Sequence, residues 1–420
     1  MNGRDRSAII FVTITIIFLV GLKSNQKFLN EYQSLAYPAR QTSPTFPTYV
    51  TGYASPSVSQ QVLDILETKT VPEIPLVFDN LLDTEELTNS SVKDDDYIPF
   101  FWHMYRSAGE TTKQLMGECL GLTLASSFSF PIDNLMFNQD NVRIMRFSNV
   151  KYFNVNLQNQ AGIYRAKNMG VTNRVETDLG PMVVDALISP NINAVLNTLL
   201  SENDIEKYES RVKGGMFMMS RNPIEREISN FYSVKLTTQR PDVAAYSLSD
   251  WFGLPSYTGN SLVRQLTNKM DPAIEITMDD LHVAKEVLRR KCIIGLLEEK
   301  QESWNRFQRI FDSRWSLKKR HTDEVCQDKL LNWGWKNRNS ITPFIDISVE
   351  DESQRPDENI VDRTTFRQIA ALNQLDMLLY EYTRHLFWEQ RLFFYKEESN
   401  SLTPQNATSL NVTSSGSEVD

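Results

Sequence analysis

Apolar residues in this chain gather in short runs, and each run is followed by a stretch with helical periodicity. The first such unit spans residues 97–126. Its apolar, aromatic run at 98–102 predicts a buried strand, residues 105–110 predict a small polar turn, and the sequence from Thr111 onward is compatible with a helix. A turn before a helix N-terminus offers backbone N–H groups to an anion. The unit therefore predicts an anion site.

The same pattern recurs in the middle of the chain. An apolar run at 215–220 predicts a second strand, which leads directly into a helical pattern at 221–235. Pro223 suits the first turn of that helix, and apolar residues at spacings of four and three place one apolar face on it. A second strand thus brings Arg221 to the start of a helix.

Seven further segments have the length and periodicity of regular elements. Strands are expected at 150–155, 183–188 and 292–297, and helices at 191–200, 277–290, 299–311 and 364–394. The helix at 277–290 opens with a Thr-x-x-Asp sequence that is typical of a helix cap. This order of elements predicts an α/β fold, with a P-loop-like parallel sheet flanked by helices and a helix-rich C-terminal part.

The N-terminus carries a membrane-targeting segment. Residues 8–22 contain no charge, and basic residues lie on both sides of them. The segment is short against the roughly 20 residues that span an average bilayer, so a cleaved signal peptide is one interpretation. An N-terminal signal anchor is favoured because no A-x-A-like cleavage site follows and early secretory membranes are thin. Sequons at Asn89, Asn406 and Asn411 support a lumenal body.

Composition divides the chain into four parts. Residues 1–23 are expected to form a cytoplasmic tip and the signal anchor. Residues 24–96 are expected to form a stem, since they include a stretch rich in Pro, Ser, Thr and Tyr. Residues 97–396 are expected to form the functional domain, and residues 397–420, which are poor in apolar residues, a disordered tail.

Charge and cysteine content exclude several functions. The 420 residues are 41% hydrophobic, which is enough for a large core. A net charge of −9 argues against a nucleic-acid partner, so any anion site must be built locally. The three cysteines allow at most one disulfide, and their spacing does not resemble a zinc site. No metal is expected.

Two arginine-bearing motifs carry the candidate chemistry. The first turn combines a guanidinium, hydroxyls and backbone amides that can converge on a phosphate, from Arg106, Ser107, Ala108, Gly109, Thr111 and Thr112. It lacks the Walker A spacing, which disfavours an ordinary ATPase. In the second motif, Arg221 and Ser229 are eight residues apart across a strand-to-helix junction and can hold one phosphate between them.

The pair of motifs resembles the nucleotide-binding motifs of sulfotransferases that use 3′-phosphoadenosine 5′-phosphosulfate (PAPS). Residues 103–113, HMYRSAGETTK, are similar to the family's first motif, of the form HIPKSGGTT, which holds the 5′-phosphosulfate. Residues 221–232, RNPIEREISNFY, look like the second motif, which holds the 3′-phosphate. Several segments between residues 98 and 394 resemble the membrane-anchored carbohydrate sulfotransferases, among them 161–170 and 260–269.

The resemblance implies a function and a location. It implies transfer of the sulfuryl group from PAPS to a hydroxyl or amine of a glycan acceptor, by a single-pass type II Golgi membrane protein with a lumenal catalytic domain. PAPS is then the co-substrate, and no metal is needed. Arg106 is expected to stabilise the leaving phosphate. The acceptor needs a general base, for which Asp185 is the candidate and a structural carboxylate the alternative.

The first motif departs from the family pattern at four positions. Tyr105 and Arg106 stand where the family has Pro-Lys, Ala108 replaces a glycine, and Glu110 replaces a threonine. Arginine has a larger, planar head group than lysine. A carboxylate beside an anion site costs on the order of 1 kcal/mol or more unless it points away. One alternative is therefore a catalytically impaired protein that binds nucleotide or glycan without turnover; another, a kinase-like phosphotransferase, is disfavoured by the missing Walker A spacing.

Other residues near the motifs have structural alternatives. Glu225 and Arg226 are expected in surface or intrahelical pairs. Arg264 is expected either to help bind nucleotide or acceptor or to lie on a helix surface. His103 is expected to pack within its strand rather than to act as a base.

Overall fold

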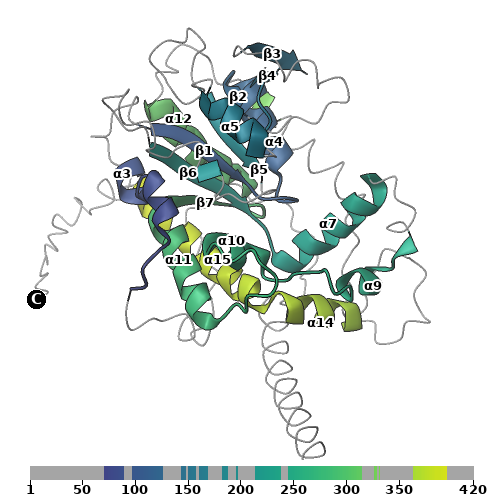
Figure 1. Ribbon diagram of the computed structural model, residues 1–420. Coiled ribbons are helices and arrows are strands. Elements are labelled where there is room, and N and C mark those ends of the chain that lie inside the picture. The colour runs from purple at the N-terminus through teal and green to yellow at the C-terminus, as the bar shows by residue number, and fades with distance from the viewer. Residues whose placement is uncertain are drawn as a thin grey trace, which may run out of the picture.

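In the computed structural model, a largely parallel sheet lies among helices, and the C-terminal part is helical (Figure 1). The structure describes residues 71–88, 97–125, 143–147, 150–157, 160–168, 182–187, 195–196, 213–237, 245–314, 326–328, 331 and 363–394. The predicted signal anchor at 8–22, the three sequons and the predicted tail lie outside these residues. Within the described part of the chain, no helix is both long and apolar enough to cross a membrane.

Seven strands form one sheet. They are β1 (Tyr97–His103), β2 (Thr123–Ala125), β3 (Ile144–Phe147), β4 (Val150–Phe153), β5 (Met182–Leu187), β6 (Lys213–Ser220) and β7 (Cys292–Leu296). Their order is β3-β4-β2-β5-β1-β6-β7, and only the β3–β4 pair is antiparallel. Every residue of β1 is buried. Because a strand covered on both faces has no solvent side, its sequence is a continuous apolar run rather than an alternation.

Helices cover both faces of the sheet. They are η1 (Leu76–Asn80), α3 (Thr84–Thr88), α4 (Gly109–Gln114), η2 (Leu115–Cys119), α5 (Gln160–Asn168), α7 (Pro223–Thr237), α9 (Leu248–Phe252), α10 (Ser261–Leu266), α11 (Met278–Lys291), α12 (Lys300–Arg314), α14 (Arg363–Leu372) and α15 (Gln374–Phe394). Successive residues of β1 point to opposite faces. Phe100 and Trp102 join the core beneath α10, α11 and α15, whereas Phe101 joins the core beneath η2 and α12.

The predicted strands at 98–102, 150–155, 183–188, 215–220 and 292–297 all form, within a few residues of their expected bounds. The predicted cap of α11 also forms, since the Asp280 carboxylate accepts hydrogen bonds from the backbone N–H and the hydroxyl of Thr277 at 2.9 and 3.0 Å. Strand β3 was not predicted. Of the helix expected at 191–200, only residues 195 and 196 are described, and both are helical.

The prediction of a single helix at 364–394 is wrong, because the structure has two helices in this range, and they meet at Asn373. At this point Gly259 lies so close to the backbone that a Cβ on it would sit 1.8 Å from the carbonyl oxygen of Leu372. The side-chain amide of Asn373 donates to the carbonyl of Ile369 at 2.9 Å and to the hydroxyl of Tyr257 at 3.1 Å. The break thus accommodates the chain before α10.

The folded part begins earlier than residue 97. Phe78 and Leu81, which fall within the predicted stem, are completely buried in the core. The backbone N–H of Leu82 donates to the carbonyl of Gly214 at 2.9 Å, so this segment continues the sheet edge near the start of β6. Residues 74–88 therefore belong to the domain.

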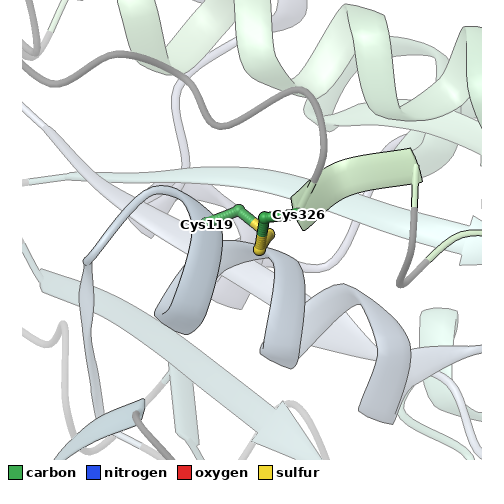
Figure 2. Close-up of a disulfide and its surroundings, with 2 residues drawn as sticks. All are labelled: Cys119 and Cys326. Atoms are coloured by element: carbon green, nitrogen blue, oxygen red, sulfur yellow. A yellow bond between two sulfur atoms is a disulfide. The ribbon is translucent and has the colours of Figure 1, made fainter.

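One disulfide joins Cys119, the last residue of η2, to Cys326 (Figure 2). Cys292 is a buried thiol in β7. The pairing agrees with the prediction of at most one disulfide. It fastens the helix that follows the first motif to a segment 207 residues further along the chain.

Candidate functional site

The two predicted motifs meet at one edge of the sheet. Strands β1 and β6 are parallel neighbours, so the turn after β1 and the start of α7 lie at their common carboxyl end. The Arg106 Nε donates a hydrogen bond to the Ser229 Oγ at 3.0 Å. The Arg221 Nη1 donates to the backbone carbonyl of Arg106 at 3.0 Å. Arg106, Arg221 and Ser229 are thereby brought together.

The first motif has an unusual backbone. Arg106 and Ala108 both have φ of 59°, in the left-handed region that residues with a Cβ disfavour. Gly109, the first residue of α4, packs on the buried His103 ring, and a Cβ there would lie 1.8 Å from the His103 Nε2. Glycine is therefore required at 109. His103 is a packed strand residue, with its ring 5.4 Å from that of Phe101, as expected.

The hydroxyls of the first motif differ in what they contact. Ser107 is completely buried, and its Oγ has no hydrogen-bond partner among the described residues. The Thr112 hydroxyl donates to the carbonyl of Ala108 at 3.1 Å, one turn back. Thr111 is half-buried. A buried hydroxyl without a partner calls for an explanation, and an anion held in the turn would supply an acceptor for Ser107.

Glu110 does not leave an uncompensated negative charge beside the turn. Its side chain is 62% exposed, and its carboxylate lies 3.3 Å from the Lys113 Nζ. Lys113 is almost completely buried one turn further along the helix. The exposed position and the neighbouring ammonium reduce the electrostatic cost that the sequence indicated for this substitution.

The second motif follows the rules for a helix start. The Asn222 Oδ1 accepts hydrogen bonds from the backbone N–H groups of Ile224 and Glu225 at 3.0 and 3.3 Å. Asparagine is a favoured N-cap, and Pro223 occupies the first helical position, where proline is preferred. Glu225 also contacts the Arg221 Nε at 3.5 Å. The Asn-Pro dipeptide thus sets the direction in which Arg221 and α7 leave the strand.

Arg226 is not a surface residue, so the surface alternative is wrong, whereas its pair with Glu227 lies within α7 as the intrahelical alternative expected. It is 1% exposed, and its Nη2 donates to the carboxylates of Glu227 and Asp376, both at 3.0 Å, and to the Ser261 hydroxyl at 2.9 Å. Burial alone would lower the pKa of Arg226, but the carboxylates of Glu227 and Asp376 raise it well above its ordinary value. The network connects α7 with α10 and α15.

Tyr105 brings the first motif into the same network. Its hydroxyl donates to the Glu227 carboxylate, and the Arg226 guanidinium lies over its ring, 5.1 Å from the centroid. Burial raises the pKa of Tyr105, although Arg226 opposes this, so the hydroxyl keeps its proton. Glu227 and Asp376 were not predicted from the sequence as parts of the site. The one available signal was Tyr105, which stands where the resembled motif has proline.

The two remaining candidates from the sequence are Asp185 and Arg264. Asp185 lies in β5, opposite Phe101 of β1 and two residues before the Leu187–His103 pair. Its side chain is outside what the structure describes, so a role as base stays a prediction. Arg264 is buried, not on the helix surface, and its Nη1 donates to three backbone carbonyls at 3.0–3.1 Å. It holds the chain between α10 and α11.

Among the described residues, no group of three or more His, Cys, Asp or Glu side chains is placed to hold a metal ion. No protein-family model matches the sequence, and no curated protein matches it significantly.

Proposed function

We propose that this protein is a PAPS-dependent sulfotransferase that sulfates a glycan acceptor. The observation that carries the proposal is the contact between the two motifs, in which Arg106 bonds to Ser229 and Arg221 bonds to the Arg106 carbonyl. Both motifs resemble those that hold the two phosphate ends of PAPS. Their convergence at the carboxyl end of adjacent parallel strands supports a P-loop-like type of fold and a single nucleotide site.

In the proposed reaction the protein binds, orients and neutralises charge. Arg221 and Ser229 hold the 3′-phosphate, while the buried Ser107 hydroxyl and the backbone N–H groups of the turn hold the 5′-phosphosulfate. The acceptor oxygen attacks sulfur as the bond between sulfur and the bridging oxygen breaks. Arg106 stabilises the charge that develops on that oxygen. A base, for which Asp185 is the candidate, takes the proton of the acceptor hydroxyl.

The proposed location is the Golgi lumen, with a type II signal anchor at residues 8–22. The Cys119–Cys326 disulfide supports this, because disulfides persist in the oxidising secretory compartments and are rare in the cytosol. The partners are then a glycan acceptor and, through the anchor, the membrane. No nucleic-acid partner and no metal is proposed.

The direct test is transfer of radiolabelled sulfate from PAPS to a panel of glycans. Wild-type protein is expected to label at least one glycan, and Arg221→Ala to lose most of that activity because a phosphate contact disappears. Arg391→Ala, at an exposed position on α15, is the matched control and should retain full activity. Equal labelling by wild type and Arg221→Ala rules out the site assignment.

The second candidate is a protein with the same site that binds nucleotide without turnover. The observation in its favour is that the Arg106 Nε already donates to the Ser229 Oγ, which holds the guanidinium at the second motif. Calorimetry with 3′-phosphoadenosine 5′-phosphate should show binding in both cases. Arg106→Lys separates them: an enzyme adapted to arginine loses activity, whereas an impaired protein gains activity or stays inactive.

A further inference from the structure

Glu298 follows β7 at the same edge of the sheet as the two motifs. Strands β6 and β7 are parallel, and the Leu297 N–H donates to the Ser220 carbonyl at 2.9 Å. The residues that come next after these two, Glu298 and Arg221, are therefore neighbours. Since β1 lies on the other side of β6, the order along the edge is the Arg106 turn, Arg221 and Glu298.

The Glu298 carboxylate is held by α15 and keeps room for a further contact. The Tyr380 hydroxyl of α15 donates to the Glu298 Oε1 at 2.5 Å. Within the part of the chain that the structure describes, the one other donor to this carboxylate is its own backbone N–H. An ionised carboxylate has about four acceptor sites on its two oxygens. A ligand can therefore donate to Glu298 without displacing Tyr380.

Protein groups surround this carboxyl without closing it off from solvent. Burial raises the pKa of the Glu298 carboxyl, the Tyr380 hydroxyl lowers it, Glu225 of α7 raises it and Arg384 of α15 lowers it, and the net shift is upward. The residue as a whole is nevertheless exposed. A hydrogen bond that a ligand donates to a partly desolvated carboxylate is stronger than the same bond in water.

A carboxylate beside a phosphate site selects for a hydrogen-bond donor. An ionised carboxylate can only accept hydrogen bonds, and its charge repels a phosphate unless a donor lies between them. In the proposed site, the 3′-phosphate lies on Arg221, next to Glu298. The ribose 2′-hydroxyl is a donor on the carbon adjacent to the one that bears this phosphate. The 6-amino group of adenine, the other donor, is at the far end of the base.

We propose that Glu298 accepts a hydrogen bond from the ribose 2′-hydroxyl and so makes the site selective for ribonucleotides over 2′-deoxyribonucleotides. This inference rests on the proposed function. Glu298 is then a specificity-determining residue, and Tyr380 positions its carboxylate. Because the contact is made to the sugar and not to the phosphosulfate, the selectivity is measured as nucleotide affinity.

The test is calorimetric titration of the full-length protein with 3′-phosphoadenosine 5′-phosphate and with its 2′-deoxy analogue. Wild type should bind the ribonucleotide about tenfold more tightly or better, because the deoxy form lacks a hydrogen bond to a charged group. Glu298→Ala should bind the two nucleotides with equal affinity.

Two further variants separate the contact from its surroundings. Glu298→Gln keeps an acceptor for the Tyr380 hydroxyl but loses the charge, so it should retain only part of the preference for the ribonucleotide. The matched control, Glu299→Ala, removes the adjacent exposed glutamate and should retain the full preference. Binding of the deoxy form by the Glu298 variants shows that they are folded.

Equal affinity of wild type for the two nucleotides would overturn the inference, and so would an undiminished preference in Glu298→Ala. The 3′,5′-bisphosphate of inosine, which lacks the 6-amino group, tests the other donor. If Glu298→Ala abolishes a preference for adenosine over inosine and leaves the ribose preference intact, Glu298 recognises the base and the proposal is wrong. A wild-type protein that binds none of these nucleotides contradicts the proposed function itself.

Discussion

The two strand-to-helix junctions at the candidate site are built in different ways. After β6, Asn222 caps α7, Pro223 fills its first position, and the helix continues for 15 residues. After β1, the chain passes through two left-handed residues, Arg106 and Ala108, and α4 has only 6 residues before it changes into a π-helical turn. The junction after β6 is stabilised by contacts within its own sequence, whereas the junction after β1 needs contacts with distant parts of the chain.

That support comes from distant parts of the chain. Arg226 and Glu227 hold Tyr105 on one side of the turn, and the Cys119–Cys326 disulfide fastens the far end of its helix. A junction that depends on tertiary contacts should lose its shape when those contacts are removed, while its neighbour keeps it. The comparison therefore predicts which variants damage the site and by how much.

The largest effect is expected for Arg226→Met. The buried carboxylates of Glu227 and Asp376 lose their common partner, and breaking a buried ion pair in this way costs about 3–5 kcal/mol. Chemical denaturation measures the loss. Arg391→Met, which removes an exposed arginine of α15, should change stability by less than about 0.5 kcal/mol. A similar small loss for Arg226→Met would show that the network does not support the fold.

Cys326→Ser should follow, with a loss of about 2–4 kcal/mol, since the disulfide closes a long loop. Because the bond holds η2, hydrogen exchange should increase in α4 and η2 and stay unchanged in α7. A reducing agent should reproduce the effect in wild type and have none in the variant. An equal increase of hydrogen exchange in α4 and in α7 would contradict the proposed difference between the two junctions.

Tyr105→Phe removes one hydrogen bond to a buried carboxylate and is expected to cost about 1.5 kcal/mol. If Tyr105 positions the turn, nucleotide affinity should also fall, because the donors of the turn lose their alignment. Tyr164→Phe, at an exposed position on α5, is the matched control and should leave stability and nucleotide affinity unchanged. A loss of stability in Tyr105→Phe with full nucleotide affinity would limit Tyr105 to a structural role.

The smallest effect is expected for Ala108→Gly. Glycine adopts the left-handed conformation without strain, but it also gains freedom in the unfolded chain, so the variant should gain at most about 1 kcal/mol. Ala284→Gly, in the regular helix α11, should instead lose about 1 kcal/mol or more. Thermal melts of the two variants provide the comparison. A loss in both would indicate that Ala108 is not strained.

Most strands could be predicted from the sequence because the parallel strands are buried and form continuous apolar runs. Strand β3 could not, because it has only four residues and carries the exposed Arg146. The break between α14 and α15 at Asn373 could not be predicted for another reason. It depends on Gly259, more than a hundred residues away, and a local pattern contains no information about such a contact.

At the candidate site, too, local features could be predicted from the sequence and contacts between distant residues could not. The two arginine-bearing motifs could be recognised from local sequence, and they lie together because adjacent parallel strands end at the same edge of the sheet; the hydrogen bond from Arg106 to Ser229 was not predicted. The network around Arg226 did not, because Asp376 is 150 residues further along the chain. A charged residue on a helix is usually on the face exposed to solvent, and Arg226 is internal only because α15 packs against α7.

The position of the disulfide has a consequence for biosynthesis. Cys119 leaves the ribosome 207 residues before Cys326, a delay of about 10–40 s. Cys292 emerges before Cys326 and is the wrong partner for Cys119, but it lies in β7 and is buried once that strand pairs with β6. We therefore expect strand pairing to protect the nascent chain from a non-native disulfide. Trapping ribosome-bound chains that end before residue 326 with an alkylating agent should find Cys119 still reactive, and a Cys119–Cys292 bond in those chains would contradict this order of events.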